Sequence, residues 1–201
     1  MRVIGLTGGI ACGKSTVSQQ LKEDYGVPIL DADVIAYRLA EPGNSLWAAF
    51  ISRYGKARIC KSDETLDRAA IAEIVFRNQT EKRWMDGMAH PLIHQKLLEG
   101  LANCKAAGCQ NVVLDVPLLF EVGWATMPSE VWVVYVNAEI QLRRLMQRND
   151  ISEEMARNRI AAQMSLEEKK KRADIVIDNS GSREETAMQV REAFERSHAS
   201  T

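Results

Sequence analysis

Arg2–Thr16, which reads RVIGLTGGIACGKST, is the stretch that decides the fold of this chain. Its apolar run Val3–Leu6 predicts a short buried strand, and Gly8–Ser15 then fits the pattern G-x-x-x-x-G-K-S/T. Glycines let the backbone turn tightly, so that successive N–H groups face one point. The helix expected from Gly13 adds free N–H groups and the positive end of its dipole. The stretch therefore predicts a phosphate-binding loop; a glycine-rich turn without a ligand is the alternative.

Single residues of this loop have separate expected tasks. Lys14 can reach the β- and γ-phosphates of a nucleoside triphosphate, and the Ser15 hydroxyl can ligate Mg²⁺. Cys12 has two interpretations: Lys14 and the helix N-terminus lower a thiol pKa, but a small filler residue, which we favour, needs no reactivity. The expected contacts to the triphosphate are Gly9, Ile10, Ala11, Cys12, Gly13, Lys14, Ser15 and Thr16.

Composition limits the class of protein. A length of 201 residues suits one α/β domain with room for inserted subdomains, and 46% hydrophobic residues suffice for a core. The net charge of −1 does not suggest a nucleic-acid partner. No apolar run is long enough for a membrane span, and the first strand leaves no room for a signal peptide, so we expect a cytoplasmic protein. The four cysteines form no C-x-x-C pair and are expected to be free thiols.

Acidic residues follow two further apolar runs. Val27–Leu30 predicts a second strand that delivers Asp31 and Asp33, and Asn111–Asp115 predicts a central strand that ends in an acid. In parallel sheets these carboxyl ends face the ligand crevice. We expect Asp33 to be the general base, whereas Asp31 either contributes there or caps the next helix. The last residue of the central strand resembles a Walker B acid, which touches Mg²⁺ directly or through water.

Residues 41–108 lie between these strands and, from Leu46 to about Ala107, show only helical patterns, over a length greater than that of a simple crossover. We interpret them as an inserted helical subdomain that holds a second substrate. Proline suits a first helical turn, so we expect a helix to open at Pro91, with His90 either capping it or facing the crevice. The expected helices are Leu46–Tyr54, Thr65–Phe76, Thr80–Met88 and Pro91–Ala107.

Arginines gather before the last strand. After a strand at Val131–Val136, two helices within residues 139–163 carry Arg143, Arg144, Arg148, Arg157 and Arg159. Guanidinium groups suit bidentate phosphate binding, so we expect at least one to serve the transferred phosphoryl group, on a lid formed by residues 141–172. The run Glu167–Arg172, in contrast, is typical of a solvated helix face.

The chain is predicted to close with a strand, Ala173–Asp178, and a helix from Glu184 to Ser197. The loop between them, with Asn179 and Gly181, is placed to meet the base of the nucleotide. Together the elements predict a three-layer α/β/α fold with a central parallel five-stranded sheet. Its core comprises residues 1–40, 109–140 and 173–201. This order suits a small kinase of the nucleoside-monophosphate-kinase type.

Six motifs, in order along the chain, resemble the dephospho-CoA kinase family. They are GLTGGIACGKST (residues 5–16), Asp31-Ala32-Asp33, His90-Pro91-Leu92-Ile93, VPLLFE (116–121), QLRRLMQR (141–148) and ADIVIDN (173–179). The resemblance implies ATP- and Mg²⁺-dependent phosphorylation of the ribose 3′-hydroxyl of dephospho-CoA, the last step of CoA synthesis. It also implies a small-molecule substrate, no nucleic acid or membrane partner, and a monomer or weak homo-oligomer.

The resemblance further implies roles for single residues. Asp33, Lys14 and Arg144 would be catalytic, and Arg148 would lie near the nucleotide. The implied substrate contacts are Thr7, Asp31, His90, Asp115, Pro117, Leu118, Glu121 and Arg159. The chain departs from the family where Ala11-Cys12 replaces Gly-Ser, so the backbone at Ala11 is expected to tolerate a Cβ. His94 also replaces an arginine after His-Pro-Leu-Ile.

Two other classes of protein compete with this interpretation. A kinase for nucleoside monophosphates or a sugar acid would keep the reaction and change the acceptor. A GTP-binding switch needs an Asn-Lys-x-Asp element, which the sequence lacks, and a regulatory ATPase usually has an acid pair where this chain has Asp115-Val116.

Overall fold

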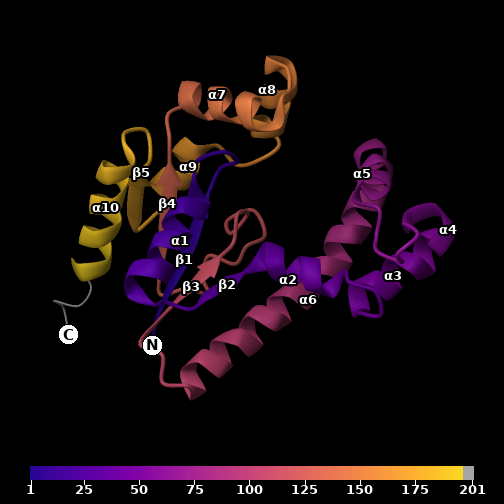
Figure 1. Ribbon diagram of the computed structural model, residues 1–201, viewed down its shortest axis with the longest axis horizontal. Helices are drawn as coiled ribbons and strands as arrows, with labels where there is room; N and C mark the ends of the chain where they lie inside the picture. Colours follow the sequence, from indigo (N-terminus) through magenta and orange to yellow (C-terminus); the bar gives the residue numbers. More distant parts are fainter. Residues whose placement is uncertain (197–201) are drawn as a thin grey trace. The chain divides into compact units, whose positions relative to one another are not determined.

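The strand that carries the phosphate-binding loop lies in the middle of a sheet in the computed structural model (Figure 1). The strands are β1 (Arg2–Gly8), β2 (Ile29–Asp31), β3 (Asn111–Asp115), β4 (Glu130–Tyr135) and β5 (Ile175–Asp178). Their order in the five-stranded sheet is β2-β3-β1-β4-β5, and β1 pairs in parallel with both β3 and β4. The predicted α/β fold with a central parallel five-stranded sheet is confirmed.

The structure describes residues 1–196, apart from the side chains of residues 76 and 77. The chain divides into two compact units. The sheet unit consists of Met1–Leu30 and the chain from Cys104 onward, and the helical unit consists of Asp31–Asn103. Ser197, the expected end of the last helix, lies outside the described residues.

The register of the sheet places the strand ends together. Leu6 of β1 is level with Asp115 of β3, and Gly8 is level with Val134 of β4. The chain order also reverses beside β1, because β3 and β4 lie on its two sides. In open parallel sheets such a reversal opens a crevice at the carboxyl ends of the strands, where ligands bind. The loop after Gly8 begins at this point.

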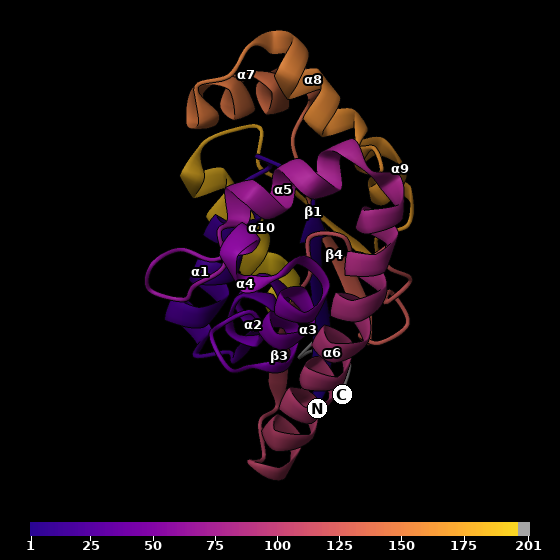
Figure 2. The same cartoon turned by 90° about the vertical axis from the view of Figure 1, so that its right-hand side faces the viewer.

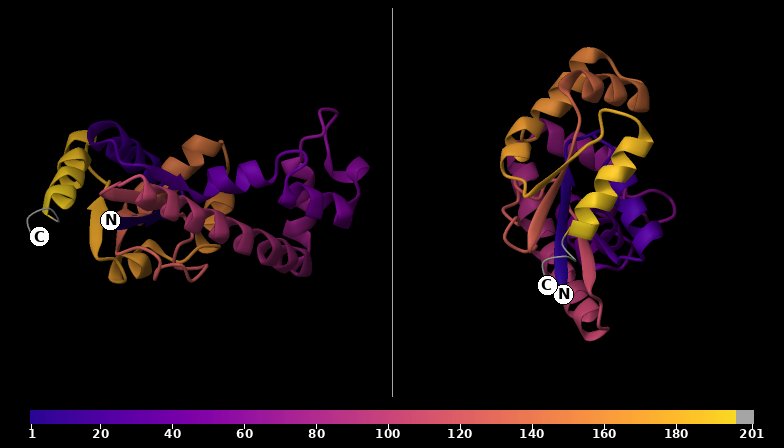
Figure 3. Two further views of the ribbon diagram at one scale, coloured as in Figure 1. Left: turned by 90° about the horizontal axis from the view of Figure 1, so that it is seen from below. Right: turned by 90° about the vertical axis from the view of Figure 1, so that its left-hand side faces the viewer.

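The central strands are covered on both faces. Consecutive residues of β1, β3 and β4 are buried, as is typical of a parallel sheet between two helical layers. Helix α1 (Lys14–Tyr25) buries Val17 and Leu21, and it packs beside α10 (Arg183–Arg196) (Figure 3). The rings of Tyr25 and Phe194 join these two helices, with centroids 4.3 Å apart. The remaining helices of this unit are α7 (Ala138–Asn149), α8 (Glu153–Ala161) and α9 (Leu166–Lys171).

The helical unit has a core of its own. Its helices are α2 (Ala32–Leu39), α3 (Ser45–Tyr54), α4 (Lys56–Ile59), α5 (Arg68–Arg77) and most of α6 (Gln79–Ala106). Figure 2 shows α3, α4 and α5 gathered beside α6. Leu46, Phe50, Ile59, Leu66 and Ile71 form the buried cluster between them. Short α4 lies between two of the expected helices, at a place where no helix was predicted, and its Ile59 is part of this cluster.

The prediction that a new helix opens at Pro91 is wrong. Helix α6 runs without interruption from Gln79 to Ala106, and Pro91 lies inside it. An interior proline removes one hydrogen bond and crowds the carbonyl four residues earlier, which here belongs to Gly87. Ala89 and Leu92 both pack against the cluster of the helical unit, so tertiary contacts on either side of the proline maintain the helix. No helix within residues 1–196 is long and apolar enough to cross a membrane.

Candidate active site

The phosphate-binding loop has the backbone of an anion cradle. Gly13 has a φ of 88° and precedes the first residue of α1, Lys14. Because glycine has no side chain with which to cap the helix, no N-cap side chain covers the first-turn amides of α1, of which the Thr16 N–H donates to the Gly13 carbonyl at 3.0 Å. Ser15 and Thr16 lie in this first turn, and both are exposed. The loop can therefore present backbone N–H groups, a lysine and two hydroxyls to a chain of phosphates.

Close packing explains why two positions of the loop are occupied by glycine. A Cβ at Gly8 would lie 2.5 Å from the Cys12 Sγ, and one at Gly13 would lie 2.0 Å from the Asn179 Nδ2. The same Asn179 amide donates to the Cys12 carbonyl at 2.8 Å, and its oxygen accepts from the Thr186 hydroxyl at 2.9 Å. Asn179, predicted as a nucleotide contact, thus holds the loop itself from the end of β5.

The thiol of Cys12 is packed inside the loop. Only 1% of the residue is exposed, and burial raises the pKa of its thiol. The backbone amides of Lys14 and Gly9 and the charge of Lys14 act in the opposite direction, but burial has the larger effect. A buried thiol of raised pKa is a poor nucleophile. This environment favours the interpretation of Cys12 as a filler residue.

Ala11 does not occupy a backbone position that tolerates a Cβ well. Its φ is 61°, in the left-handed region that favours glycine. This conformation costs a non-glycine residue about 1–2 kcal/mol, and the greater freedom of glycine in the unfolded chain offsets about 0.5–1 kcal/mol of that cost. The expectation for this position is therefore corrected: the loop keeps a strained backbone despite the alanine.

We expect Ala11→Gly to raise the free energy of unfolding by roughly 0.5–1 kcal/mol, measured by urea denaturation. The matched control is Ala187→Gly in the middle of α10, where glycine should lower the free energy of unfolding by a similar amount. Equal losses of stability in both variants would show that the Cβ of Ala11 causes no strain.

The side chains of Lys14 and Asp115, two predicted site residues, contact each other in the sheet unit. The Lys14 Nζ forms an ion pair with the Asp115 Oδ1, and the carboxyl side chain is only 3% exposed. Strand β3 positions the carboxylate, and the first turn of α1 positions the lysine. The structure thus brings together two residues that the sequence predicted separately.

The same place suits Mg²⁺ better than a metal held by protein alone. Among residues 1–196, no group of three or more His, Cys, Asp or Glu side chains could enclose a metal ion. Mg²⁺ usually binds one or two protein oxygens and completes its shell with water and phosphate oxygens. The Ser15 hydroxyl and the Asp115 carboxylate are oxygen donors of this kind.

A loop after β3 contacts the strand that leads into the phosphate-binding loop. The Thr7 hydroxyl donates to the Pro117 carbonyl at 2.9 Å. Glu121 accepts from the backbone N–H of Met164 at 3.1 Å. Leu118, in contrast, is 37% exposed. Of these sequence-predicted substrate contacts, Thr7, Pro117 and Glu121 make hydrogen bonds within the protein that fix the surroundings of the loop.

The predicted lid arginines lie on α7 and α8. Arg144 is half-buried, and Arg148 and Arg159 are exposed. The Arg148 Nε donates to the Asn149 side chain at 3.0 Å. Within the described part of the chain, no carboxylate pairs with Arg144 or Arg159, so both can accept an anionic partner. Gly181 lies after β5, close to the Glu185 carboxylate.

Three predicted site residues belong to the helical unit. Asp31 is the N-cap of α2, where its carboxylate accepts from the backbone N–H groups of Asp33 at 2.8 Å and Val34 at 3.1 Å. The capping interpretation of Asp31 is confirmed. Asp33 is exposed in the first turn of the same helix. His90 lies inside α6, so the interpretation of His90 as a helix cap is wrong. Its Nε2 is 4.0 Å from the Asp86 carboxylate.

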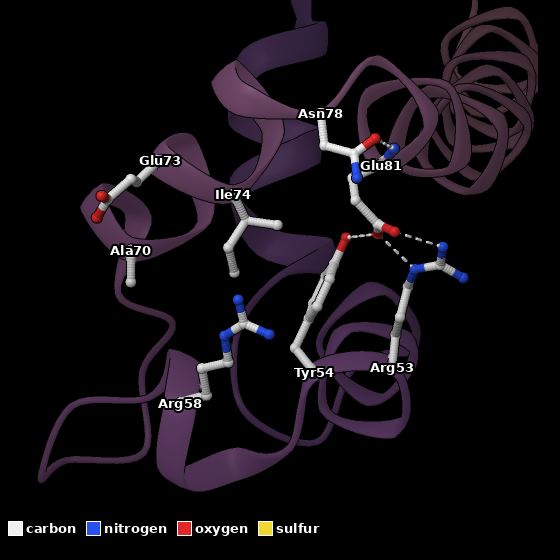
Figure 4. A pocket seen from close by; sticks show the side chains of 8 residues that line it. All are labelled: Arg53, Tyr54, Arg58, Ala70, Glu73, Ile74, Asn78 and Glu81. Atoms are coloured by element: carbon white, nitrogen blue, oxygen red, sulfur yellow. Dashed lines mark hydrogen bonds and ion pairs between the residues drawn. The ribbon is translucent and has the colours of Figure 1, made fainter.

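The helical unit also contains a cavity of about 850 Å³ that the sequence did not indicate. Figure 4 shows that the Arg58 side chain points into it, beside Tyr54 and Ile74. At its edge Glu81 accepts from Arg53 at 2.6 Å and from the Tyr54 hydroxyl at 2.6 Å. These hydrogen bonds, that of Arg53 first, lower the pKa of Glu81 to about 2. Burial, followed by the bond to Glu81, raises the pKa of Tyr54 to about 12.

Three side chains from the predicted lid segment also contact the loop, and the sequence did not reveal them. Gln163 accepts from the Ile10 N–H at 2.9 Å, and Gln141 donates to the Ile10 carbonyl at 2.9 Å. The third is Lys169, which is completely buried. The run Glu167–Arg172 is therefore not only a solvated face, because the helix directs one of its lysines inward. Spacing alone gives no signal for such contacts, since their partners are more than 100 residues away.

Comparison with known proteins reveals relatives along nearly the whole chain. A family model for dephospho-CoA kinase matches residues 2–185. A dephospho-CoA kinase from Geobacillus kaustophilus is 46% identical over 187 residues, which cover 93% of this chain and 92% of the relative. The solved dephospho-CoA kinase from Campylobacter jejuni has a TM-score of 0.74 at 29% identity, and covers 98% of this chain and 97% of its own. The protein TT1252 from Thermus thermophilus has a TM-score of 0.81 at 33% identity, with the same coverage.

Proposed function

This chain belongs to the dephospho-CoA kinase family, and we propose that it transfers the γ-phosphoryl group of ATP to the ribose 3′-hydroxyl of dephospho-CoA. The products are CoA and ADP, and the reaction is the last step of CoA biosynthesis. The observation that carries the proposal is the phosphate-binding loop, in which Lys14 is held by buried Asp115 at the carboxyl ends of β1 and β3.

The donor half of the reaction is assigned to the loop. Its backbone N–H groups and Lys14 bind the phosphates of ATP, with Lys14 at the β- and γ-phosphates. Lys14 leaves Asp115 for the phosphates when the nucleotide enters, which frees the carboxylate. Ser15 and Asp115 would hold Mg²⁺, which would supply neutralisation of phosphate charge. The loop thereby stabilises the charge that spreads over the transferred group.

The acceptor half is assigned to the helical unit. The carboxylate of Asp33 removes the proton from the 3′-hydroxyl while the hydroxyl oxygen attacks the γ-phosphorus. ADP departs as the leaving group. Asp31 fixes the first turn of α2 and so the backbone that carries Asp33. We place part of the large acceptor in the cavity beside Arg58, with His90 as a further contact from α6.

Residues 141–172 are assigned to a lid. Arg144 acts on the transferred phosphoryl group, with Arg148 and Arg159 as further phosphate contacts. Water must be excluded during the transfer, because it competes with the acceptor hydroxyl. We further propose a cytoplasmic enzyme that works as a monomer or weak homo-oligomer.

The proposal is tested by an acceptor screen with ATP and Mg²⁺. We expect ADP release to depend strictly on dephospho-CoA, with AMP, adenosine and shikimate as matched acceptors that give only background. Mass spectrometry and phosphorus NMR of the product should find one new phosphate at the 3′ position. ATP turnover at the same rate without any acceptor would contradict a kinase and favour an ATPase.

A further inference from the structure

Lys169 is a cation without access to solvent. Its side chain is 0% exposed, and its Nζ has three oxygen partners. It donates to the Gly8 carbonyl at 3.1 Å and to the Pro117 carbonyl at 2.9 Å. The third partner is the Glu121 carboxylate, at 2.9 Å. A lysine has three donors, so every proton of the ammonium group has an acceptor.

The three acceptors come from separate parts of the sheet unit. Gly8 ends β1 and opens the phosphate-binding loop, while Pro117 and Glu121 lie in the loop after β3, the strand of Asp115. The Pro117 carbonyl also accepts from Thr7 in β1. Lys169 itself is on α9, in the segment assigned to the lid. One ammonium group therefore connects the phosphate-binding loop, the loop of the metal-binding acid and the lid segment.

We propose that Lys169 is a positioning residue for ATP binding, which sets the start of the phosphate-binding loop with Glu121 as its counter-charge. This inference rests on the proposed function only for the identity of the nucleotide. The direct contact is with the Gly8 carbonyl, where β1 turns into the loop. When this carbonyl is fixed, the following peptide groups keep the orientation in which their N–H groups converge on a phosphate.

Further contacts of the same segment support this role. Gln163 accepts from the Ile10 N–H and Gln141 donates to the Ile10 carbonyl, two residues after Gly8. The charge of Lys169 also reaches the loop interior: burial raises the pKa of the Cys12 thiol, and Lys169 is among the charges that oppose this rise. A purely structural lysine would stabilise the fold; a positioning lysine also determines how well the loop binds phosphate.

The test compares Lys169→Arg with the double variant Lys169→Met/Glu121→Gln. The single variant Lys169→Met leaves a partly buried carboxylate without its partner and can fail to fold, whereas the double variant removes both charges and retains side-chain volume. The matched control is Lys171→Met, since Lys171 is an exposed lysine of the same helix. All variants are first compared with the wild type by thermal unfolding.

We expect the double variant to bind a non-hydrolysable ATP analogue about tenfold or more weakly by calorimetry without any acceptor. Its KM for ATP should rise to the same extent. Lys169→Arg should regain most of the affinity, and Lys171→Met should match the wild type. A folded double variant with unchanged affinity for the analogue overturns the proposal, whatever its melting temperature. The calorimetric result does not depend on phosphoryl transfer, so it separates this inference from the assignment of the acceptor.

Discussion

Lys14→Ala is expected to abolish phosphoryl transfer, with kcat lowered by about a thousandfold or more. The loss of a single preorganised donor at a site of developing charge typically costs about 10²–10³ in rate. Lys14 offers a full positive charge rather than a dipole, and its side chain is only 17% exposed, so water replaces it poorly. The measurement is the steady-state rate of ADP formation with saturating ATP and dephospho-CoA.

The same substitution leaves the Asp115 carboxylate, 3% exposed, without its lysine. Breaking a buried pair on one side can cost about 3–5 kcal/mol of stability, so an unfolded variant must be distinguished from an inactive one. The melting temperature of the variant and its response to Mg²⁺ serve for this purpose, since Mg²⁺ can replace the missing cation beside Asp115. Lys22→Ala, at the exposed last turn of α1, is the matched control and should retain wild-type turnover. Unchanged kcat in folded Lys14→Ala would contradict the assignment of the phosphate-binding loop.

The sheet and the loop could be predicted because their signals are local. Val3–Leu6 is apolar, the glycines follow immediately, and Asp115 ends another apolar run, so chain order and strand polarity suffice to bring them together. The ion pair between Lys14 and Asp115 follows from this register, in which Leu6 is level with Asp115. Patterns within about 15 residues, combined with the rules of parallel sheets, are therefore sufficient to predict this part of the site.

The remainder depends on contacts between distant residues, for which spacing gives no signal. Pro91 usually opens or ends a helix, but packing of Ala89 and Leu92 on the helical unit maintains α6 through it. Lys169 lies in a run that is charged throughout, and its contacts with distant residues, such as the Gly8 carbonyl 161 residues earlier, distinguish it from Lys170 and Lys171. The backbone strain at Ala11 was likewise hidden, because the loop imposes a φ that its residue type does not favour.

Asp33→Asn is expected to lower kcat by at least about a hundredfold while binding of ATP survives. A positioned general base contributes about 10²–10⁴ in rate, and asparagine keeps the size of aspartate but cannot take the proton. Asp33 lies in the first turn of α2 and is exposed, so it is not part of a core. Loss of its favourable interaction with the helix dipole costs only about 0.3–1 kcal/mol, far less than the roughly 2.7 kcal/mol that a hundredfold change in rate represents.

The measurements that separate the base from a binding role are kcat and the affinity for the ATP analogue. Because Asp33 is assigned to proton removal, its replacement should lower kcat at saturating substrates and leave analogue binding within about twofold of the wild type. Glu41→Gln, an exposed carboxylate just after α2, is the matched control for loss of one negative charge and should turn over normally. Phosphoryl transfer passes through a loose transition state in which the proton can leave late. Turnover near the wild-type rate in Asp33→Asn would therefore exclude Asp33 as the base and leave positioning and charge stabilisation by the loop as the main sources of catalysis.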